Sequence, residues 1–250
     1  MAENCRRVPE EDKGKEPEVR YYDYSKSQLE AKAENLVRET NPARLLQPEK
    51  IDVYDVIDFL GCTPDWLYLT PVGKILGMTA FSDFIWPAWP SSHFETGMQP
   101  HEVSVQKGTI LIDQSLVDAE DKEKERFTVM HECFHWILHQ KCYQRFRKEY
   151  SAICTSSMMR NTNKKPMTAL EINEWQANYC AASFLMPKTA VEHVFSQALG
   201  QETEIGSYLD PCDGKVKSAI HESAEQFGVH YSPMLYRLQG LQIVKKTENY

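Results

Sequence analysis

The chain has 250 residues, of which 42% are hydrophobic and 11% aromatic, enough for the core of one domain with at most a small addition. Its formal net charge of −8 gives no overall positive field to attract nucleic acid or an anionic membrane. No apolar run reaches the roughly 20 residues of a membrane-spanning helix, and the N-terminus lacks the apolar stretch of a secretory signal. The seven cysteines are an odd number without a C-x-x-C pair, which favours reduced thiols in the cytoplasm.

The predicted elements follow a charged N-terminal segment. Residues 1–24 contain almost nothing to bury, so we expect a disordered tail there. The stretch 25–40 combines helix-forming residues with apolar positions at helical spacing, and a second short helix over 51–61 should stop at Gly61. Between 66 and 112, β-branched and aromatic residues gather in short runs broken by Gly and Pro, which is typical of strands.

From residue 118 almost to the end of the chain the pattern is helical. Strands in one block and helices in another indicate an α+β domain rather than a doubly wound sheet. We therefore predict a single domain over residues 25–250, with a core over 45–200 and a C-terminal helical lobe over 201–250.

The segment VMHECFHWILH (129–139) contains three histidines that are each four residues apart. On a helix, His131 and His135 lie one turn apart on the same face, so both imidazoles can bind one metal ion. Glu132 lies about 100° around the helix axis, too far to join the same ligand set but close enough to reach a water molecule beside the ion. The H-E-x-x-H motif therefore predicts two metal ligands and a general base.

His139 continues the same stripe, about 12 Å from His131 along the helix at 1.5 Å per residue. One tetrahedral ion cannot bridge that distance, so we expect His139 to pack beside the site or to support a ligand. The alternative interpretation is a chance H-E-x-x-H match on an ordinary helix, and a third ligand would decide between the two.

The segment 167–187 supplies candidates for that third ligand. Thr168 and Glu171 form a capping-box pattern, so a helix should begin there. Further along, Glu174 and Asn178 share a helix face, near small alanines that permit close approach to a neighbouring helix. Glu174 would complete a His-His-Glu site, and Asn178 would accept a hydrogen bond from a ligating imidazole. Glu171 is the rival ligand; its role in the cap favours Glu174, but periodicity alone leaves both open.

Together, RFTVMHECFHWILH (126–139) and EWQANYCAASFLMP (174–187) resemble the two metal-binding segments of the ImmA/IrrE family of zinc metallopeptidases. Weaker likeness in the flanking helical segments extends the resemblance to roughly residues 45–245. The resemblance implies a zincin-like fold that is mostly helical, with a small antiparallel or mixed sheet beside the H-E-x-x-H helix.

The resemblance also implies roles for individual residues, with Zn²⁺ as the cofactor. The metal ligands of the family fall on His131, His135 and Glu174. Its catalytic base falls on Glu132, and its Asn/Asp position falls on Asn178.

The family resemblance implies a zinc-dependent endopeptidase that cleaves a regulatory protein, such as a helix-turn-helix repressor of a mobile element. The alternative is a catalytically impaired, zinc-containing relative that acts by binding, because Phe134 stands where the family usually has glycine. A helix-turn-helix is conceivable over 224–238, but residues 211–250 contain five basic and four acidic side chains. That net charge of +1 is too low for strong binding to DNA phosphates. We therefore expect a protein partner, and we expect binding to neither nucleic acid nor a membrane.

Overall fold

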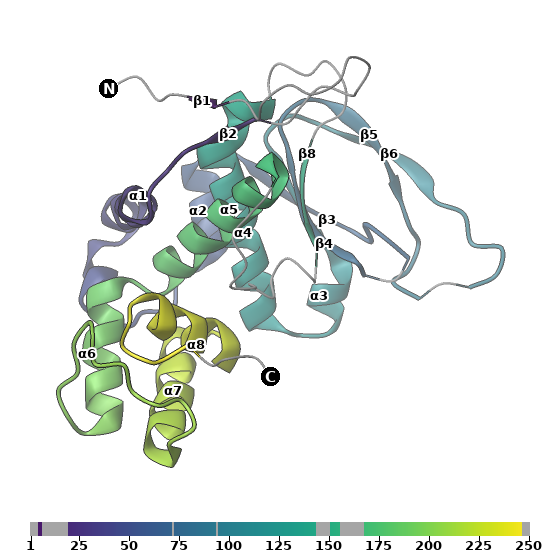
Figure 1. Ribbon diagram of the computed structural model, residues 1–250. Coiled ribbons are helices and arrows are strands. Elements are labelled where there is room, and N and C mark those ends of the chain that lie inside the picture. Colours follow the sequence, from purple (N-terminus) through teal and green to yellow (C-terminus); the bar gives the residue numbers. More distant parts are fainter. Residues whose placement is uncertain are drawn as a thin grey trace. The chain divides into compact units, whose positions relative to one another are not determined.

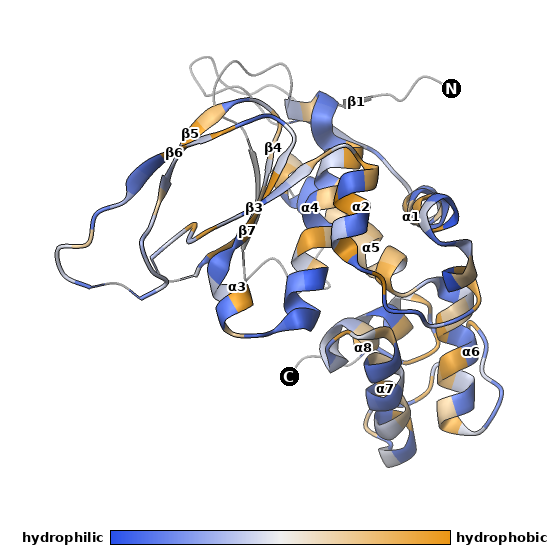
Figure 2. Cartoon of the chain, turned by 180° about the vertical axis from the view of Figure 1, so that it is seen from behind, coloured by the Kyte–Doolittle hydropathy of each residue, from blue (hydrophilic) through white to orange (hydrophobic). Residues whose placement is uncertain are grey.

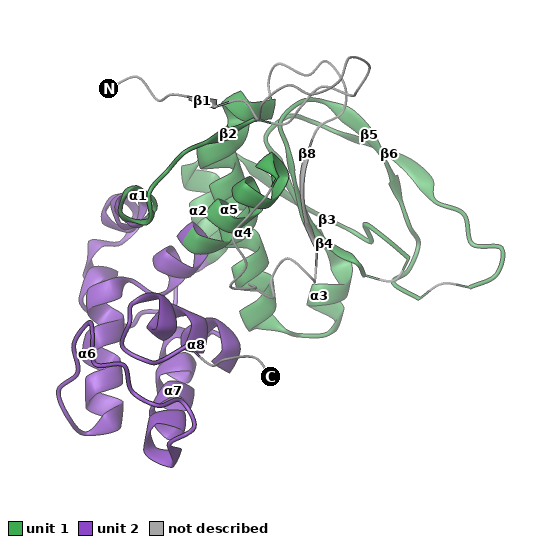
Figure 3. Cartoon of the chain, viewed as in Figure 1, with its two compact units in different colours: residues 1–29, 53–179 green, residues 30–52, 180–250 purple. Residues whose placement is uncertain are grey.

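The structure is a computed structural model that describes residues 5–6, 20–71, 73–93, 95–143, 151–155 and 168–246, with the backbone alone for 5–6 and 151–155. The chain divides into two compact units (Figure 3). Unit 1 combines residues 1–29 with 53–179, and unit 2 combines 30–52 with 180–250. The prediction of one domain over 25–250 stays a prediction.

The helices and strands of both units are labelled in Figure 1. In chain order they are β1 (Cys5–Arg6), β2 (Tyr21–Tyr22), α1 (Lys26–Thr40), η1 (Pro42–Leu45), α2 (Val53–Phe59), β3 (Thr63–Leu67), β4 (Ile75–Ala80), β5 (Phe84–Ala88), β6 (His101–Val105), β7 (Thr109–Asp113), α3 (Gln114–Asp118), α4 (Lys122–Tyr143), β8 (Ser151–Thr155), α5 (Ala169–Leu185), α6 (Lys188–Leu199), α7 (Gly214–Phe227) and α8 (Tyr231–Gly240). No helix in the described ranges is both long and apolar enough to span a bilayer.

Unit 1 is built on a four-stranded mixed sheet with the strand order β3-β7-β4-β8. Strands β3 and β7 are parallel, whereas β4 runs antiparallel to both β7 and β8. Helix α4, which carries the H-E-x-x-H motif, packs against β4, β7 and β8. The predicted α+β fold, with a small mixed sheet beside this helix, is therefore confirmed.

Part of the core of unit 1 lies between this sheet and the hairpin of β5 and β6, which pair in an antiparallel register. Figure 2 shows hydrophobic residues along β4 and on the helices packed next to it. One cluster of buried side chains joins the two sheets: Leu69, Met78, Ala80, Phe84, Val105 and Leu111. Alternating strand residues point to opposite faces, so β4 can fill this cluster with one face and meet α4 with the other.

Strand β8 differs from the prediction that the chain is helical from residue 118 on. It pairs with β4 over five residues, with Ile153 opposite Met78. A strand is stabilised by a partner strand that is distant in sequence, and local helical periodicity does not report that partner.

The predicted N-terminal tail is described only in part. Residues 1–4 and 7–19 of the segment 1–24 lie outside the described residues, so disorder there stays a prediction. Tyr21–Tyr22 form strand β2, and Tyr22 is buried in a cluster with Phe81, Cys142 and Tyr143. The end of the segment is therefore packed against unit 1, which its charged composition did not indicate.

Unit 2 holds the C-terminal end of α5 with two buried arginines. Arg44 donates from Nη2 to the carbonyl of Phe184 over 3.1 Å, and Arg237 donates from Nε to the carbonyl of Met186 over 2.9 Å. The last carbonyls of a helix have no partner within the helix, so these side chains satisfy them. Arg237 also forms an ion pair with Glu30, whose side chain is partly buried.

Candidate metal centre

Two helices of unit 1 supply the candidate metal centre. Helix α4 presents His131 and His135 from successive turns, and both imidazoles are fully buried. Helix α5 presents Glu174, which is 4% exposed. The predicted capping box starts α5, because Thr168 Oγ1 accepts from the N–H of Glu171 (3.1 Å) and the Glu171 carboxylate accepts from the N–H of Thr168 (2.8 Å). Glu171 is thus occupied at the helix start, and Glu174 lies almost one turn further on.

The side chains of these two helices converge on one point. His131 Nε2 lies 3.1 Å from Glu174 Oε2, His135 Nε2 lies 3.2 Å from Glu174 Oε1, and the two Nε2 atoms are 2.9 Å apart. Ligand atoms at about 2.0–2.1 Å from one tetrahedral zinc ion would be about 3.3–3.4 Å from each other. The three residues can therefore hold a metal ion after only a small outward movement.

The electronic character of these atoms also fits a cation. His131 Nδ1 lies 3.0 Å from Asn178 Oδ1, an oxygen that can only accept; with the ring proton on Nδ1, Nε2 offers a lone pair to a metal ion. Burial lowers the pKa of His135 below its ordinary value, which keeps this imidazole neutral. Burial alone would raise the pKa of Glu174, but the neighbouring imidazoles of His135 and His131 outweigh it and lower that pKa. Electron-rich atoms thus face one another in a buried space, where a cation would relieve their repulsion.

Glu132 is also buried, and its carboxylate is held against strand β4. The hydroxyl of Thr79 donates to Glu132 Oε2 over 2.6 Å and lies 3.0 Å from the Glu132 main-chain carbonyl oxygen. Gly77, two residues earlier on the same strand face, permits this approach. A Cβ atom there would lie 2.8 Å from Glu132 Oε1 and 2.8 Å from Thr128 Cγ2. The sheet therefore orients the glutamate of the H-E-x-x-H motif.

Comparison with known protein families places this geometry in context. The family model of peptidase M78, described as the IrrE N-terminal-like domain, matches residues 99–239, which is more than half of the chain and includes both α4 and α5. The chain belongs to the peptidase M78 family. This confirms the resemblance to ImmA/IrrE metallopeptidases. A comparison with curated proteins gave no match.

In this M78 protein the structure brings together the residues that the sequence singled out. His131, His135 and Glu174 meet, and Asn178 contacts His131 as expected. Their functional roles stay predictions. His139 lies beside the site, with its Nδ1 atom 3.0 Å from His135 Nδ1, which agrees with the expected supporting position.

Sequence reasoning missed Gly77 and Thr79 in the M78 site. A glycine inside a strand-like run marks a close backbone approach, and ILGMTAF (75–81) contains that signal. The threonine two positions later faces the same side of the strand. Read together, the two residues could have indicated the face on which α4 packs.

Proposed function

We propose that the protein is a zinc-dependent endopeptidase that hydrolyses peptide bonds of a protein substrate. In this proposal His131, His135 and Glu174 hold the metal ion, and Glu132 is the general base. The observation that carries the proposal is the convergence of two imidazole Nε2 atoms and one carboxylate within 2.9–3.2 Å of one another in a buried site.

The donor set supports zinc over Ca²⁺ and Mg²⁺. Two imidazole nitrogens and one carboxylate are the protein ligands of a class of catalytic zinc sites, whereas Ca²⁺ and Mg²⁺ prefer oxygen ligands alone. Bound zinc would supply Lewis-acid chemistry, which polarises a carbonyl and lowers the pKa of water toward about 7.

The residues of the chain perform the proton transfers in this mechanism. Glu132 takes a proton from the attacking water and delivers it to the nitrogen of the leaving amine, which is worth roughly 10²–10⁴-fold in rate. The Thr79 hydroxyl orients the glutamate by its 2.6 Å hydrogen bond to Oε2 and stabilises the ionised form that a base needs. A hydrogen bond from His131 Nδ1–H to Asn178 Oδ1 holds the imidazole ring with its Nε2 atom unprotonated.

The substrate class in this proposal is a regulatory protein, specifically a helix-turn-helix repressor of a mobile element. This part rests on the family likeness alone. The assignment of residues 25–250 to one metallopeptidase domain combines that likeness with the sequence pattern. The odd number of cysteines supports the cytoplasm as the location.

The alternative is a zinc-containing relative that binds its partner without cleaving it. The observation behind it is Phe134, a fully buried side chain at the position before His135 where the family usually has glycine. A bulky residue there changes how α4 packs while leaving the three candidate ligands in place.

Cleavage of a candidate repressor by the zinc-loaded protein, followed by mass spectrometry, separates these functions. We expect a single cut that is lost with a chelator and lost again in Glu132→Gln, while Glu132→Gln keeps its zinc. Zinc binding by the wild type without any cut would favour the binding protein. A Glu132→Gln variant that cleaves as fast as the wild type would refute the assignment of the base.

A further inference from the structure

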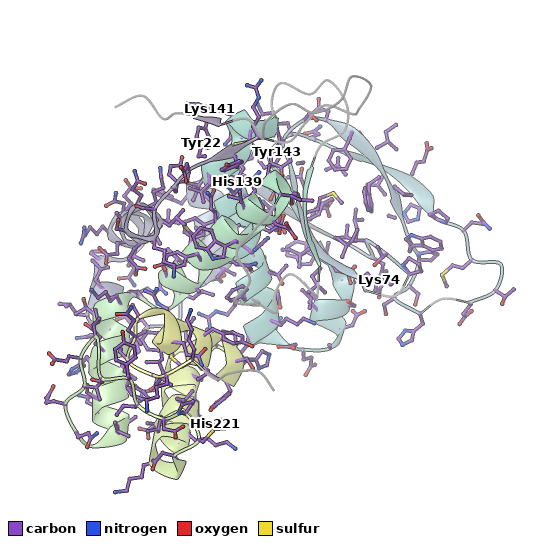
Figure 4. The ribbon with its side chains drawn as sticks, in the orientation of Figure 1. Tyr22, Lys74, His139, Lys141, Tyr143 and His221 are labelled. Atoms are coloured by element: carbon purple, nitrogen blue, oxygen red, sulfur yellow. The ribbon has the colours of Figure 1, made fainter. Side chains whose placement is uncertain are left out.

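A chain of three hydrogen bonds leads from His135 away from the candidate metal ligands. His135 Nδ1 lies 3.0 Å from His139 Nδ1, His139 Nε2 lies 3.0 Å from Gln176 Oε1, and Gln176 Nε2 donates to the main-chain carbonyl of Tyr22 over 2.6 Å. Both histidines and Gln176 are buried. Figure 4 shows His139 in the same part of unit 1 as Tyr22. The peptidase mechanism above makes no use of this chain of contacts.

The carbonyl of Tyr22 sets the direction of every bond in the chain. A carbonyl oxygen only accepts, so Gln176 must present its amide NH₂ group there. The reversed amide would place two oxygen acceptors 2.6 Å apart. Gln176 Oε1 therefore faces His139 and accepts from its Nε2–H group.

The same reasoning continues through the two imidazoles. A neutral histidine has one N–H group, and the fully buried His139 has no carboxylate among the hydrogen-bond partners of its two ring nitrogens, so the chain of contacts is satisfied by a neutral ring. Because His139 uses its proton at Nε2, its Nδ1 atom accepts. The proton between the two rings then belongs to His135 Nδ1, which leaves His135 Nε2 with a lone pair.

We propose that His139 and Gln176 are positioning residues that hold His135 in its metal-binding tautomer, and that the Tyr22 carbonyl determines the tautomer. This inference rests on the metal site of the proposed function, but it does not depend on peptide hydrolysis. It extends the support of the ligands beyond Asn178, which acts on His131 alone.

The hydrogen-bond chain matters because Glu174 competes for the same proton. Glu174 Oε1 lies 3.2 Å from His135 Nε2, and a carboxylate would hold a proton on that nitrogen. A ring protonated at Nε2 cannot bind the ion. Without the chain, metal binding would therefore have to reverse the tautomer first.

The fold offers a matched control on the same helix, against the same N-terminal segment. Asn173 Nδ2 donates to the carbonyl of Arg20 over 2.9 Å, so it anchors the N-terminal segment to α5 much as Gln176 does. Among the described residues, the side chain of His139 contacts His135 and Gln176, and Asn173 is outside this chain of hydrogen bonds. Asn173→Leu removes an anchor but leaves the hydrogen-bond chain, whereas Gln176→Met removes both.

The test compares the wild type with Gln176→Met, His139→Phe, His139→Asn and Asn173→Leu. One readout is the protonated ring nitrogen of His135 in the metal-free protein, measured by long-range ¹H–¹⁵N NMR and assigned with a His135→Gln variant. The other is the dissociation constant for Zn²⁺, measured by competition with a chelating dye. Circular dichroism shows which variants are folded.

We expect His135 of the wild type to be protonated at Nδ1. In Gln176→Met and His139→Phe the proton should move to Nε2, and zinc affinity should fall about 10–100-fold, as for other residues that support metal ligands. His139→Asn, whose amide oxygen can replace the acceptor Nδ1, should retain most of the affinity. Asn173→Leu should bind zinc like the wild type.

Protonation of His135 at Nε2 in the wild type would overturn the inference without the need for any variant. Equal zinc affinity in the wild type and folded Gln176→Met would overturn it too, as would an equal loss in Asn173→Leu. These outcomes leave peptide cleavage untouched. Conversely, tight zinc binding and the Nδ1–H tautomer in a protein that cleaves nothing would refute the peptidase proposal alone.

Discussion

Substitution of Gly77 by alanine tests the close approach between strand β4 and the H-E-x-x-H helix. The new Cβ would lie 2.8 Å from Glu132 Oε1 and from Thr128 Cγ2, while ordinary contacts begin at 3.4 Å. The strand and helix would have to separate by about 0.6 Å, because Glu132 is held by Thr79 and cannot simply swing away. Overpacking of this kind costs about 1–3 kcal/mol, and a shift of about 1 Å in a catalytic group can cost about 100-fold in rate.

Urea unfolding measures the first effect, and cleavage kinetics of the zinc-loaded protein measure the second. Gly240→Ala is the control, because nothing lies within 4 Å of a Cβ at that position; its unfolding free energy should change by no more than about 1 kcal/mol. If Gly77→Ala unfolded at the wild-type urea concentration and kept its rate, the packing of β4 on α4 described above would be wrong.

Three further predictions concern the metal, pH and unit 2. Glu174→Ala should lower the zinc content of the purified protein, measured by elemental analysis; an unchanged content would place the third ligand elsewhere. The buried His139 has a pKa of about 3 against an ordinary 6.5, so the unfolded chain binds more protons between these values. Burial of the neutral His139 ring therefore costs no protonation energy above about pH 6.5. Below that pH, the free energy of unfolding falls by about 1.4 kcal/mol per pH unit. Between pH 7 and 5, the free energy of unfolding, measured with urea, should fall by about 2 kcal/mol more for the metal-free wild type than for His139→Asn. Equal losses in the two proteins would contradict this prediction. Arg237→Leu should destabilise the protein by about 2–3 kcal/mol, because it removes the charge-assisted hydrogen bonds between Arg237 and the partly buried Glu30. The double variant with Glu30→Gln should recover part of the loss, and no recovery would show that the ion pair is not the cause.

The positions of the candidate ligands were predictable because they follow from local rules. Helical spacing places His131 and His135 on one face, and the capping box identifies the start of α5 and so separates Glu171 from Glu174. Both signals lie within a few residues in sequence. They indicate which side chains share a face, and the close match of the two segments to one family supplied the pairing of the helices.

The support of the site could not be predicted in the same way. Thr79 reaches Glu132 from 53 residues away in sequence, and Gln176 reaches the Tyr22 carbonyl across 154 residues. Such contacts depend on how the elements pack, and no local periodicity contains that information. The charged composition of residues 1–24 likewise concealed that its end packs against α5, because the contacts of Arg20 and Tyr22 there use main-chain oxygens.

The last acceptor in the hydrogen-bond chain belongs to the main chain, so replacing the side chain of Tyr22 does not delete it. Insertions and deletions act differently from substitutions. Successive carbonyls of an extended strand point in opposite directions. The carbonyls of Arg20 and Tyr22, two residues apart, therefore both face α5. A single residue added or removed just before α1 would shift the register and turn an N–H group toward Gln176, reversing the polarity at that point. The segment should therefore tolerate changes of amino-acid identity far better than changes of length.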